Sequence, residues 1–121
     1  MRRLTLSLIF FVLLVSLPGC TLNEEFSAQD EIADGQTKGE QIIQALEEYH
    51  TQNGRYPDRL DDLIPTHIPE VPYTLAGEEF TFEEILGDVY YLSFPVTSKK
   101  IETTCSYIKR LENWDCSVFL E

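Results

Sequence analysis

Residues 37–57 read TKGEQIIQALEEYHTQNGRYP, and this stretch decides the fold because it predicts where one long helix begins and ends. Thr37 and Glu40 fit the capping box that opens a helix. Apolar side chains then recur at helical spacing, at Ile42, Ile43, Ala45, Leu46 and Tyr49. Most polar side chains of the stretch, Glu40, Gln44, Glu47 and Glu48, fall on the other side. The pattern predicts an amphipathic helix with one packed face and one wet face.

The end of this helix is predicted at Gly54, because a glycine after the last turn readily adopts the left-handed conformation that terminates helices. Tyr56 stands before Pro57 and is pushed into an extended conformation. Residues 58–64 then carry three apolar side chains behind an Asp cap, which predicts a single helical turn. The proline-rich run 65–72 forces an extended path.

From residue 88 onward the apolar period changes to two, which is the pattern of a strand with one buried face. Its inward-facing set is Tyr90, Leu92, Phe94 and Val96. A second alternating run follows at 101–107 and a third begins at Trp114 and continues to Leu120. These three runs predict an antiparallel meander.

Residues 73–87 fit more than one structure. Residues 74–75 and 80–82 look like short strands about a turn at Gly77, whereas 83–86 fits a turn of helix. The fold class predicted for residues 37–121 is therefore α+β, with one amphipathic helix packed on a three- to four-stranded antiparallel sheet.

The helix-to-proline stretch is also the part with a family resemblance. Residues 45–57, followed by Leu60, Leu63, Pro65 and the run 68–72, resemble the soluble part of type IV pilins and type II secretion pseudopilins. In that family a helix ends at a similar Asn-Gly-Arg-Tyr-Pro and a sheet packs across it. The resemblance covers about residues 40–121 and implies a pilin-like domain.

The amino-terminal segment has the pattern of a signal peptide. Arg2 and Arg3 precede an apolar run from Leu4 to Leu17 that is too short for a permanent membrane span. The Gly19-Cys20 junction resembles the bacterial lipobox, which implies cleavage between these two residues and lipid attachment to Cys20. An ordinary secreted or membrane-anchored protein with a chance cysteine is the alternative. We expect residues 1–19 to be removed.

Lipidation would display the chain outside the cytoplasm, anchored in the cell envelope. In Gram-negative lipoproteins an Asp after the acylated cysteine favours retention in the inner membrane, and this chain has Thr21 there. The outer membrane is therefore the expected location. This anchor also departs from pilins, whose hydrophobic helix is retained as the filament core, so we expect a pilin-like domain presented on lipid rather than a filament subunit.

The segment 20–36 is polar, with few sizeable apolar groups, and is predicted to be a flexible tether. A docking peptide centred on Phe26 is the alternative. The whole chain has 21 acidic and 9 basic side chains, a net charge of −12. This charge disfavours nucleic acid and anionic lipid surfaces as partners.

Cys105 and Cys116 remain once Cys20 carries lipid, and an even pair in an exported domain indicates a disulfide. Both cysteines share the parity of their large apolar neighbours, so paired strands would place the two sulfurs on one face. Such a staple suits a small domain, whose core alone is marginally stable. A cysteine pair near the carboxyl terminus is also similar to pilins.

No catalytic residues are predicted. His50 and His67 are the only histidines, and neither belongs to a ligand motif, so we interpret both as surface residues. The sequence has no phosphate-binding glycine loop and no nucleophile elbow. We therefore expect a protein that is not an enzyme and carries no cofactor beyond its lipid.

Two clusters invite other interpretations. Calcium is a candidate ligand of the carboxylates Asp58, Asp61, Asp62, Glu78, Glu79, Glu83, Glu84 and Asp88, but runs of carboxylates favour a solvated acidic face. The aromatic set Tyr90, Tyr91, Phe94, Tyr107, Trp114 and Phe119 suggests a sugar-binding face, against which core packing is the favoured interpretation.

Two functions follow from this sequence. The first is a membrane-anchored structural or protein-interaction module with an envelope protein as partner, associated with a secretion or pilus-like system. The second is an acidic surface lipoprotein that inhibits a basic enzyme such as lysozyme. The resemblance favours the first and charge alone favours the second.

Overall fold

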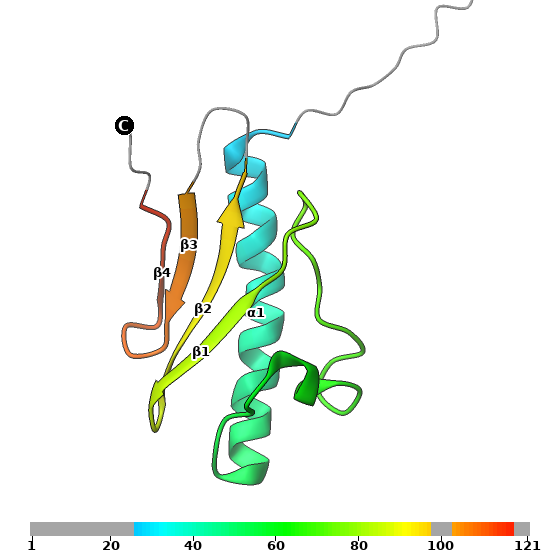
Figure 1. The fold of residues 1–121 in the computed structure, drawn as a ribbon, viewed down its shortest axis with the longest axis vertical. Coiled ribbons are helices and arrows are strands. Elements are labelled where there is room, and N and C mark those ends of the chain that lie inside the picture. The colour runs from blue at the N-terminus through cyan, green and yellow to red at the C-terminus, as the bar shows by residue number, and fades with distance from the viewer. Residues whose placement is uncertain (1–25, 98–102, 118–121) are drawn as a thin grey trace, which may run out of the picture.

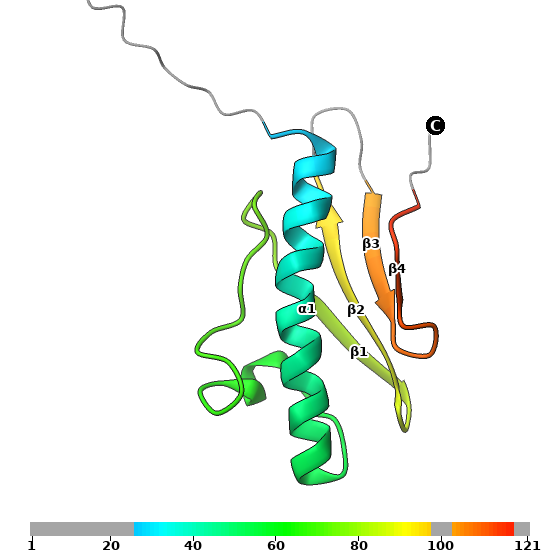
Figure 2. The same ribbon diagram turned by 180° about the vertical axis from the view of Figure 1, so that it is seen from behind.

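The computed structural model describes residues 26–97 and 103–117, which form one long helix and one antiparallel sheet (Figure 1). The elements are α1 (Ala28–Asn53), the 3₁₀ turn η1 (Leu60–Leu63), β1 (Thr81–Leu86), β2 (Val89–Val96), β3 (Thr103–Ile108) and β4 (Asn113–Asp115). The strands pair in the order β1-β2-β3-β4, each antiparallel to the next. Figure 2 shows α1 lying across one face of the sheet. The predicted α+β class, with one helix and a four-stranded antiparallel sheet, is confirmed.

Helix α1 begins earlier than the sequence predicted. Ser27 is the cap: its hydroxyl accepts from the Asp30 N–H at 3.2 Å, and the Asp30 carboxylate accepts from the Ser27 N–H at 3.1 Å. The Ser27 hydroxyl also donates to the Asp30 carboxylate at 2.6 Å, and this hydrogen bond, followed by the one from the Ser27 N–H, lowers the pKa of Asp30. Thr37 is not a cap, because its hydroxyl donates to the Ala33 carbonyl inside the helix at 2.8 Å.

The prediction of a flexible tether is therefore wrong for residues 28–36, which are helical; residues 20–25 lie outside the described part of the chain. Contacts with distant strands explain the difference. Ile32 packs against the core, and the buried Glu31 carboxylate accepts a hydrogen bond from the Thr97 N–H at 2.9 Å. This hydrogen bond satisfies the Thr97 N–H, just after β2, and fixes the position of this polar segment.

Two glycines let the helix approach the sheet closely. A Cβ atom on Gly35 would lie 2.3 Å from the Phe94 ring, and one on Gly39 would lie 2.5 Å from the Trp114 ring. Positions four apart lie on the same face of a helix, so the two glycines form one shallow site for two aromatic rings. Gly39 therefore allows the close approach of Trp114, although it lies within the capping box that the sequence predicted between Thr37 and Glu40.

The predicted end of the helix is confirmed. Gly54 has a left-handed φ of 72°, and its N–H donates to the His50 carbonyl at 2.8 Å. The predicted helical turn that follows is η1, in which Leu60 and Leu63 are buried.

Strand β1 corrects the interpretation of residues 73–87. Residues 83–86 are strand, not helix, because they pair with Val89, Tyr90 and Tyr91 of β2. Thr74 and Leu75 are not strand either. The N–H of Thr74 donates to the Glu78 carbonyl at 2.9 Å, and its hydroxyl accepts from the Glu78 N–H, which closes a turn there.

The alternation predicted for the central strand is confirmed. Residues 90, 92, 94 and 96 of β2 are buried and the residues between them are partly exposed. The third alternating run contains β4, whereas residues 98–102 and 118–121 lie outside the described chain. A continuous row of aromatic contacts, with centroids 4.8 to 6.2 Å apart, fills the space between sheet and helix: Phe80, Phe94, Trp114, Tyr107, Tyr90 and Tyr56.

Candidate functional site

The predicted disulfide is present. Cys105 on β3 and Cys116, just after β4, are bonded through their sulfurs, and their Cα atoms lie 4.1 Å apart. The strand register explains why the two cysteines meet. Ser106 lies opposite Asp115, and in an antiparallel pair this brings the adjacent Cys105 and Cys116 opposite each other. Cys105 is buried and Cys116 is partly buried against the core, so the bond fixes the short edge strand to the rest of the sheet. Gly19 and Cys20, the predicted cleavage and lipid residues, lie outside the described part of the chain.

The two histidines lie in separate places. His50 Nε2 is 3.0 Å from Asp88 Oδ1, and its ring stacks on Tyr56 with centroids 4.4 Å apart. His67 is not the surface residue that the sequence suggested, because its side chain is only 5% exposed. Its Nδ1 lies 3.8 Å from Glu48 Oε2, and its ring meets the edge of Tyr49. Neither histidine shares its surroundings with the other.

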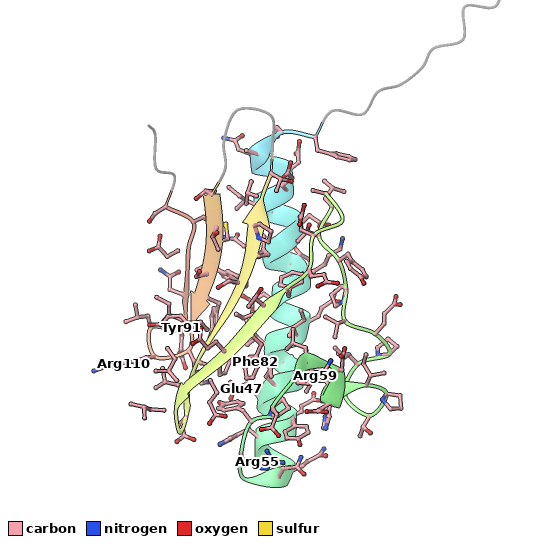
Figure 3. The ribbon with its side chains drawn as sticks, viewed as in Figure 1. Glu47, Arg55, Arg59, Phe82, Tyr91 and Arg110 are labelled. Carbon is pink, nitrogen blue, oxygen red and sulfur yellow. A yellow bond between two sulfur atoms is a disulfide. The ribbon has the colours of Figure 1, made fainter. Side chains whose placement is uncertain are left out.

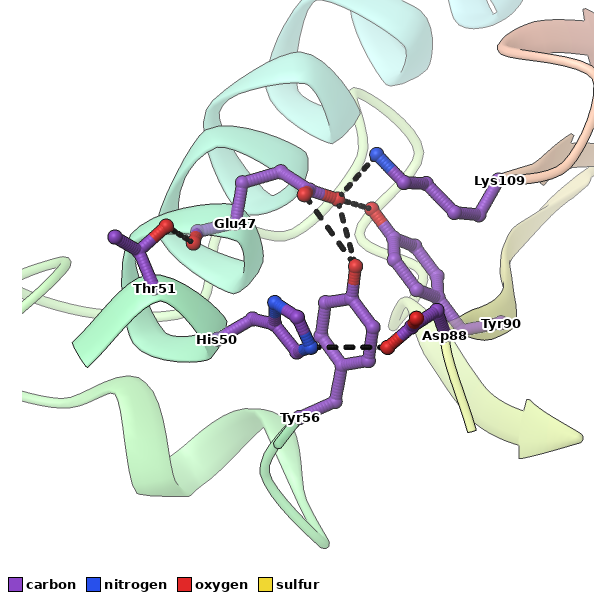
Figure 4. A network of polar contacts seen from close by, with 7 residues as sticks. All are labelled: Glu47, His50, Thr51, Tyr56, Asp88, Tyr90 and Lys109. Carbon is purple, nitrogen blue, oxygen red and sulfur yellow. Dashed lines mark hydrogen bonds and ion pairs between the residues drawn. The ribbon is translucent and has the colours of Figure 1, made fainter. Parts of the chain in front are cut away.

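Glu47 is the centre of a polar network between the helix and the sheet (Figure 4). Its carboxylate accepts hydrogen bonds from the Tyr56 and Tyr90 hydroxyls, each at 3.1 Å. Lys109 Nζ lies 2.9 Å from the same carboxylate. The prediction that Glu47 lies on the wet face of the helix is therefore wrong.

Burial gives this network its electrostatic character. Desolvation, followed by the charge and the hydrogen bonds of Glu47, raises the pKa of both Tyr56 and Tyr90 far above the ordinary value. The hydrogen bond to Glu47 also raises the pKa of Lys109. Both phenols therefore stay protonated and Lys109 stays charged at neutral pH, which makes the network a satisfied structural contact rather than a source of mobile protons.

A signal for Glu47 was present in the sequence. Position 47 is four residues after the buried Ile43, so the two share a helix stripe. A tyrosine in a buried position needs a hydrogen-bond partner, and Tyr90 was predicted to face inward. The partner could not be chosen from several acidic residues without the fold.

A groove of about 460 Å³ opens between η1, the proline-rich loop and the start of β1. Its apolar lining comes from Leu60, Val71, Pro72, Tyr73, Phe80 and Phe82. Its polar lining comes from Asp58, Arg59, Asp61, Glu79 and Thr81. Figure 3 labels Arg59, the residue before η1, and Phe82 on β1, which both line this groove. This is the candidate binding site, and we call it the β1 groove.

Charge in the β1 groove is mainly negative. Arg59 is the one basic side chain among the described residues that line it, and its Nη2 lies 2.7 Å from Asp61 Oδ2. Asp58 is paired outside the groove with Arg55 at 3.5 Å. Glu79 has no cationic partner among the groove-lining residues. An apolar floor with an acidic rim can hold an apolar side chain flanked by basic ones.

The predicted acidic clusters do not converge. Asp58, Asp61 and Asp88 each face a different basic side chain, and Asp62 accepts from the Arg59 N–H. Within residues 26–97 and 103–117 no group of three or more His, Cys, Asp or Glu side chains is placed to hold a metal ion.

Most of the predicted aromatic set belongs to the core. Tyr90, Phe94, Tyr107 and Trp114 contact one another beneath α1. The Trp114 indole N–H donates to Glu40 at 2.8 Å, so even its polar atom is occupied. Tyr91 lies on the opposite face of the sheet, and Phe119 is outside the described residues. The core-packing interpretation is thus confirmed for four of the rings.

Comparisons of the chain with protein-family models, with curated proteins and with solved structures found no match. No helix in the described part of the chain is both long and apolar enough to cross a membrane.

Proposed function

We propose that this protein is an envelope lipoprotein whose pilin-like α+β domain is a protein-interaction module. The observation that carries the proposal is the edge strand β1, which among the described residues has a neighbouring strand on one side only and whose first residues, Thr81 and Phe82, line a preformed groove. Unpaired backbone groups of an edge strand are ready hydrogen-bonding partners for another chain. A groove beside such an edge supplies room for side chains.

The anchor gives this module an orientation. The chain enters the domain at Ser27, and α1 extends from there over 26 residues, or about 39 Å at 1.5 Å per residue. Figures 1 and 2 place η1 beside the carboxyl-terminal half of α1. The η1 side of the β1 groove is thus away from the lipid attached to Cys20, where a partner in the periplasm or at the cell surface reaches it.

The disulfide between Cys105 and Cys116 supports a location outside the cytoplasm, because such bonds persist in oxidising compartments. Association with a secretion or pilus-like system is part of the proposal and is supported by the resemblance of residues 45–57 and 68–72 to pilins and pseudopilins. The lipid replaces the retained hydrophobic helix of those proteins.

Charge favours a second candidate, an inhibitor of a basic enzyme such as lysozyme. The net charge of −12 would steer a cationic enzyme toward the domain, and exposed carboxylates at Glu48, Glu70, Glu83 and Glu84 add to this field. Inhibition of lysozyme by the purified protein at low salt, relieved at high salt, would support this candidate over the first.

Crosslinking in intact envelopes tests the interaction module. A photoreactive residue replaces Glu83 on β1 in one variant and Gln44 on the exposed side of α1 in the other; both positions are exposed. We expect a discrete protein adduct from position 83 and none from position 44. Equal adducts from both positions, or none from either, would contradict an interaction module that uses β1.

A further inference from the structure

The open edge and its groove specify the chemistry of the partner. This inference rests on the proposed interaction module and names the kind of segment that it binds. Thr81 and residues 83–86 are exposed along β1, whereas Phe82 is partly buried against the core. In an edge strand, alternate N–H and C=O groups point away from the sheet and remain free to pair. The edge therefore offers backbone hydrogen bonds to an extended segment.

Two adjacent carboxylates, those of Glu83 and Glu84, lie on this edge strand. Successive side chains of a strand point to opposite faces, so Glu83 and Glu84 place one negative charge on each face of β1. An incoming strand has side chains on both faces, and on each face they would meet one of these two carboxylates. Opposite charges directly across paired strands are favourable and like charges are unfavourable, so the edge selects a basic segment and rejects an acidic one.

The β1 groove imposes a second requirement on the side chains of the partner segment. Its floor is apolar at Leu60, Val71 and Phe80, while Asp58, Asp61 and Glu79 stand on its rim. The single arginine of the lining is held by Asp61 at 2.7 Å, which leaves the rim negative overall. A segment with an apolar side chain between basic ones satisfies both the floor and the rim.

We propose that an extended segment of a partner protein, alternating apolar with Lys or Arg side chains, adds to β1 as a fifth strand and inserts an apolar side chain into the β1 groove. A second copy of this chain is a poor occupant. Pairing β1 with itself would bring Glu83 and Glu84 against the same residues of the other copy, in a chain of net charge −12.

The test uses the full-length protein, isotope-labelled and held in detergent micelles, with two synthetic peptides of matched length. One peptide alternates valine with lysine and the other alternates valine with glutamate. We expect the lysine peptide to slow amide exchange and shift the amide resonances of Thr81 to Leu86, and the glutamate peptide to leave them unchanged.

Two variants that replace surface residues by lysine separate strand addition from general electrostatic attraction. Glu83→Lys with Glu84→Lys should weaken binding of the lysine peptide about tenfold, and should admit the glutamate peptide. Gln44→Lys with Glu48→Lys, on the exposed side of α1, is the control and should leave affinity within about twofold. A melting curve of each variant, compared with that of the parent, reports whether the domain is folded.

Several results would overturn the proposal. Equal weakening by the α1 control would assign binding to the acidic surface as a whole, and resonance shifts spread away from β1 would do the same. Binding of neither peptide, or concentration-dependent dimers formed through β1, would also refute a basic fifth strand. If crosslinking from position 83 still captures one partner while the lysine peptide fails, the interaction module survives and strand addition does not.

Discussion

The hydroxyl of Tyr90 on β2 donates a hydrogen bond to the carboxylate of Glu47 on α1 at 3.1 Å, and this contact joins the two layers of the domain. Tyr56 and Lys109 bind the same carboxylate from the loop after the helix and from the end of β3. Removing the carboxylate would leave two hydroxyls and one ammonium group in a partly buried place without their partner.

We therefore predict that Glu47→Ala lowers the free energy of unfolding by about 1–3 kcal/mol. Glu48→Ala, at the next position and more exposed, is the matched control and should cost less than about 0.5 kcal/mol. Urea denaturation of both variants measures the difference. Equal effects would show that Glu47 has no special structural role.

Alkaline pH should destabilise the fold through the same tyrosines. Burial first, and then Glu47, raises the pKa of Tyr56 and Tyr90 in the folded state above the unfolded value of about 10. The unfolded chain thus loses these protons first as pH rises. Their contribution is fully present below about pH 10 and is lost progressively above it. Lys109, whose pKa Glu47 also raises, acts in the same direction.

Melting temperatures measured from pH 8 to pH 11 check this prediction. Tyr56→Phe with Tyr90→Phe should flatten the fall above pH 10, relative to the parent, because the titrating hydroxyls are gone. An unchanged slope in the double variant would assign the alkaline loss of stability to other groups.

The close packing of Gly35 predicts the direction in which a substitution there changes stability. Replacing Gly by Ala inside a helix normally stabilises it by about 1 kcal/mol. At Gly35 the new methyl would lie 2.3 Å from the Phe94 ring, so the clash should outweigh this gain and Gly35→Ala should lower stability by about 1–3 kcal/mol. Gln41→Ala, at an exposed position of α1, is the control and should be close to neutral. A stabilised Gly35→Ala variant would mean that the helix and β2 are not in close contact.

Loss of the disulfide should also be costly. Cys105 and Cys116 close a short loop, which is worth about 3 kcal/mol in the chain-entropy treatment. Mass spectrometry of unreduced peptides should find the linked pair in protein purified from the envelope. Reduction should lower the melting temperature by about 12–24 °C, since 1 kcal/mol corresponds to roughly 4–8 °C for a domain of this size. Two freely alkylated thiols in the unreduced protein would contradict the pairing.

Sequence predicted the parts of the fold that depend on local patterns. The end of α1 follows from Gly54, and the buried face of β2 follows from strict alternation, because neighbours along the chain decide both. The start of α1 does not follow, since the partner of Glu31 is Thr97, just after β2, and the partner of Gly35 is Phe94 on β2. Contacts between segments far apart in the chain have no local signature.

The candidate site was hidden for the same reason. Residues 83–86 suggested a helical turn, and only their pairing with β2 makes them an edge strand. The β1 groove then forms where this edge meets η1 and the proline-rich loop, which the sequence could not place side by side. Glu47 was assigned to the wet face because its three partners come from separate segments.

The central claim is the proposed export with a lipid anchor, since the orientation of the β1 groove toward its partner depends on it. Metabolic labelling with a fatty-acid probe tests it most directly, using the wild-type protein, Cys20→Ala and, as a neighbouring control, Thr21→Ala. We expect label on the wild type and on Thr21→Ala, a mature protein that begins at Cys20, and no label on Cys20→Ala. Label that persists in Cys20→Ala, or a wild-type protein that is unlabelled and retains residues 1–19, would contradict it.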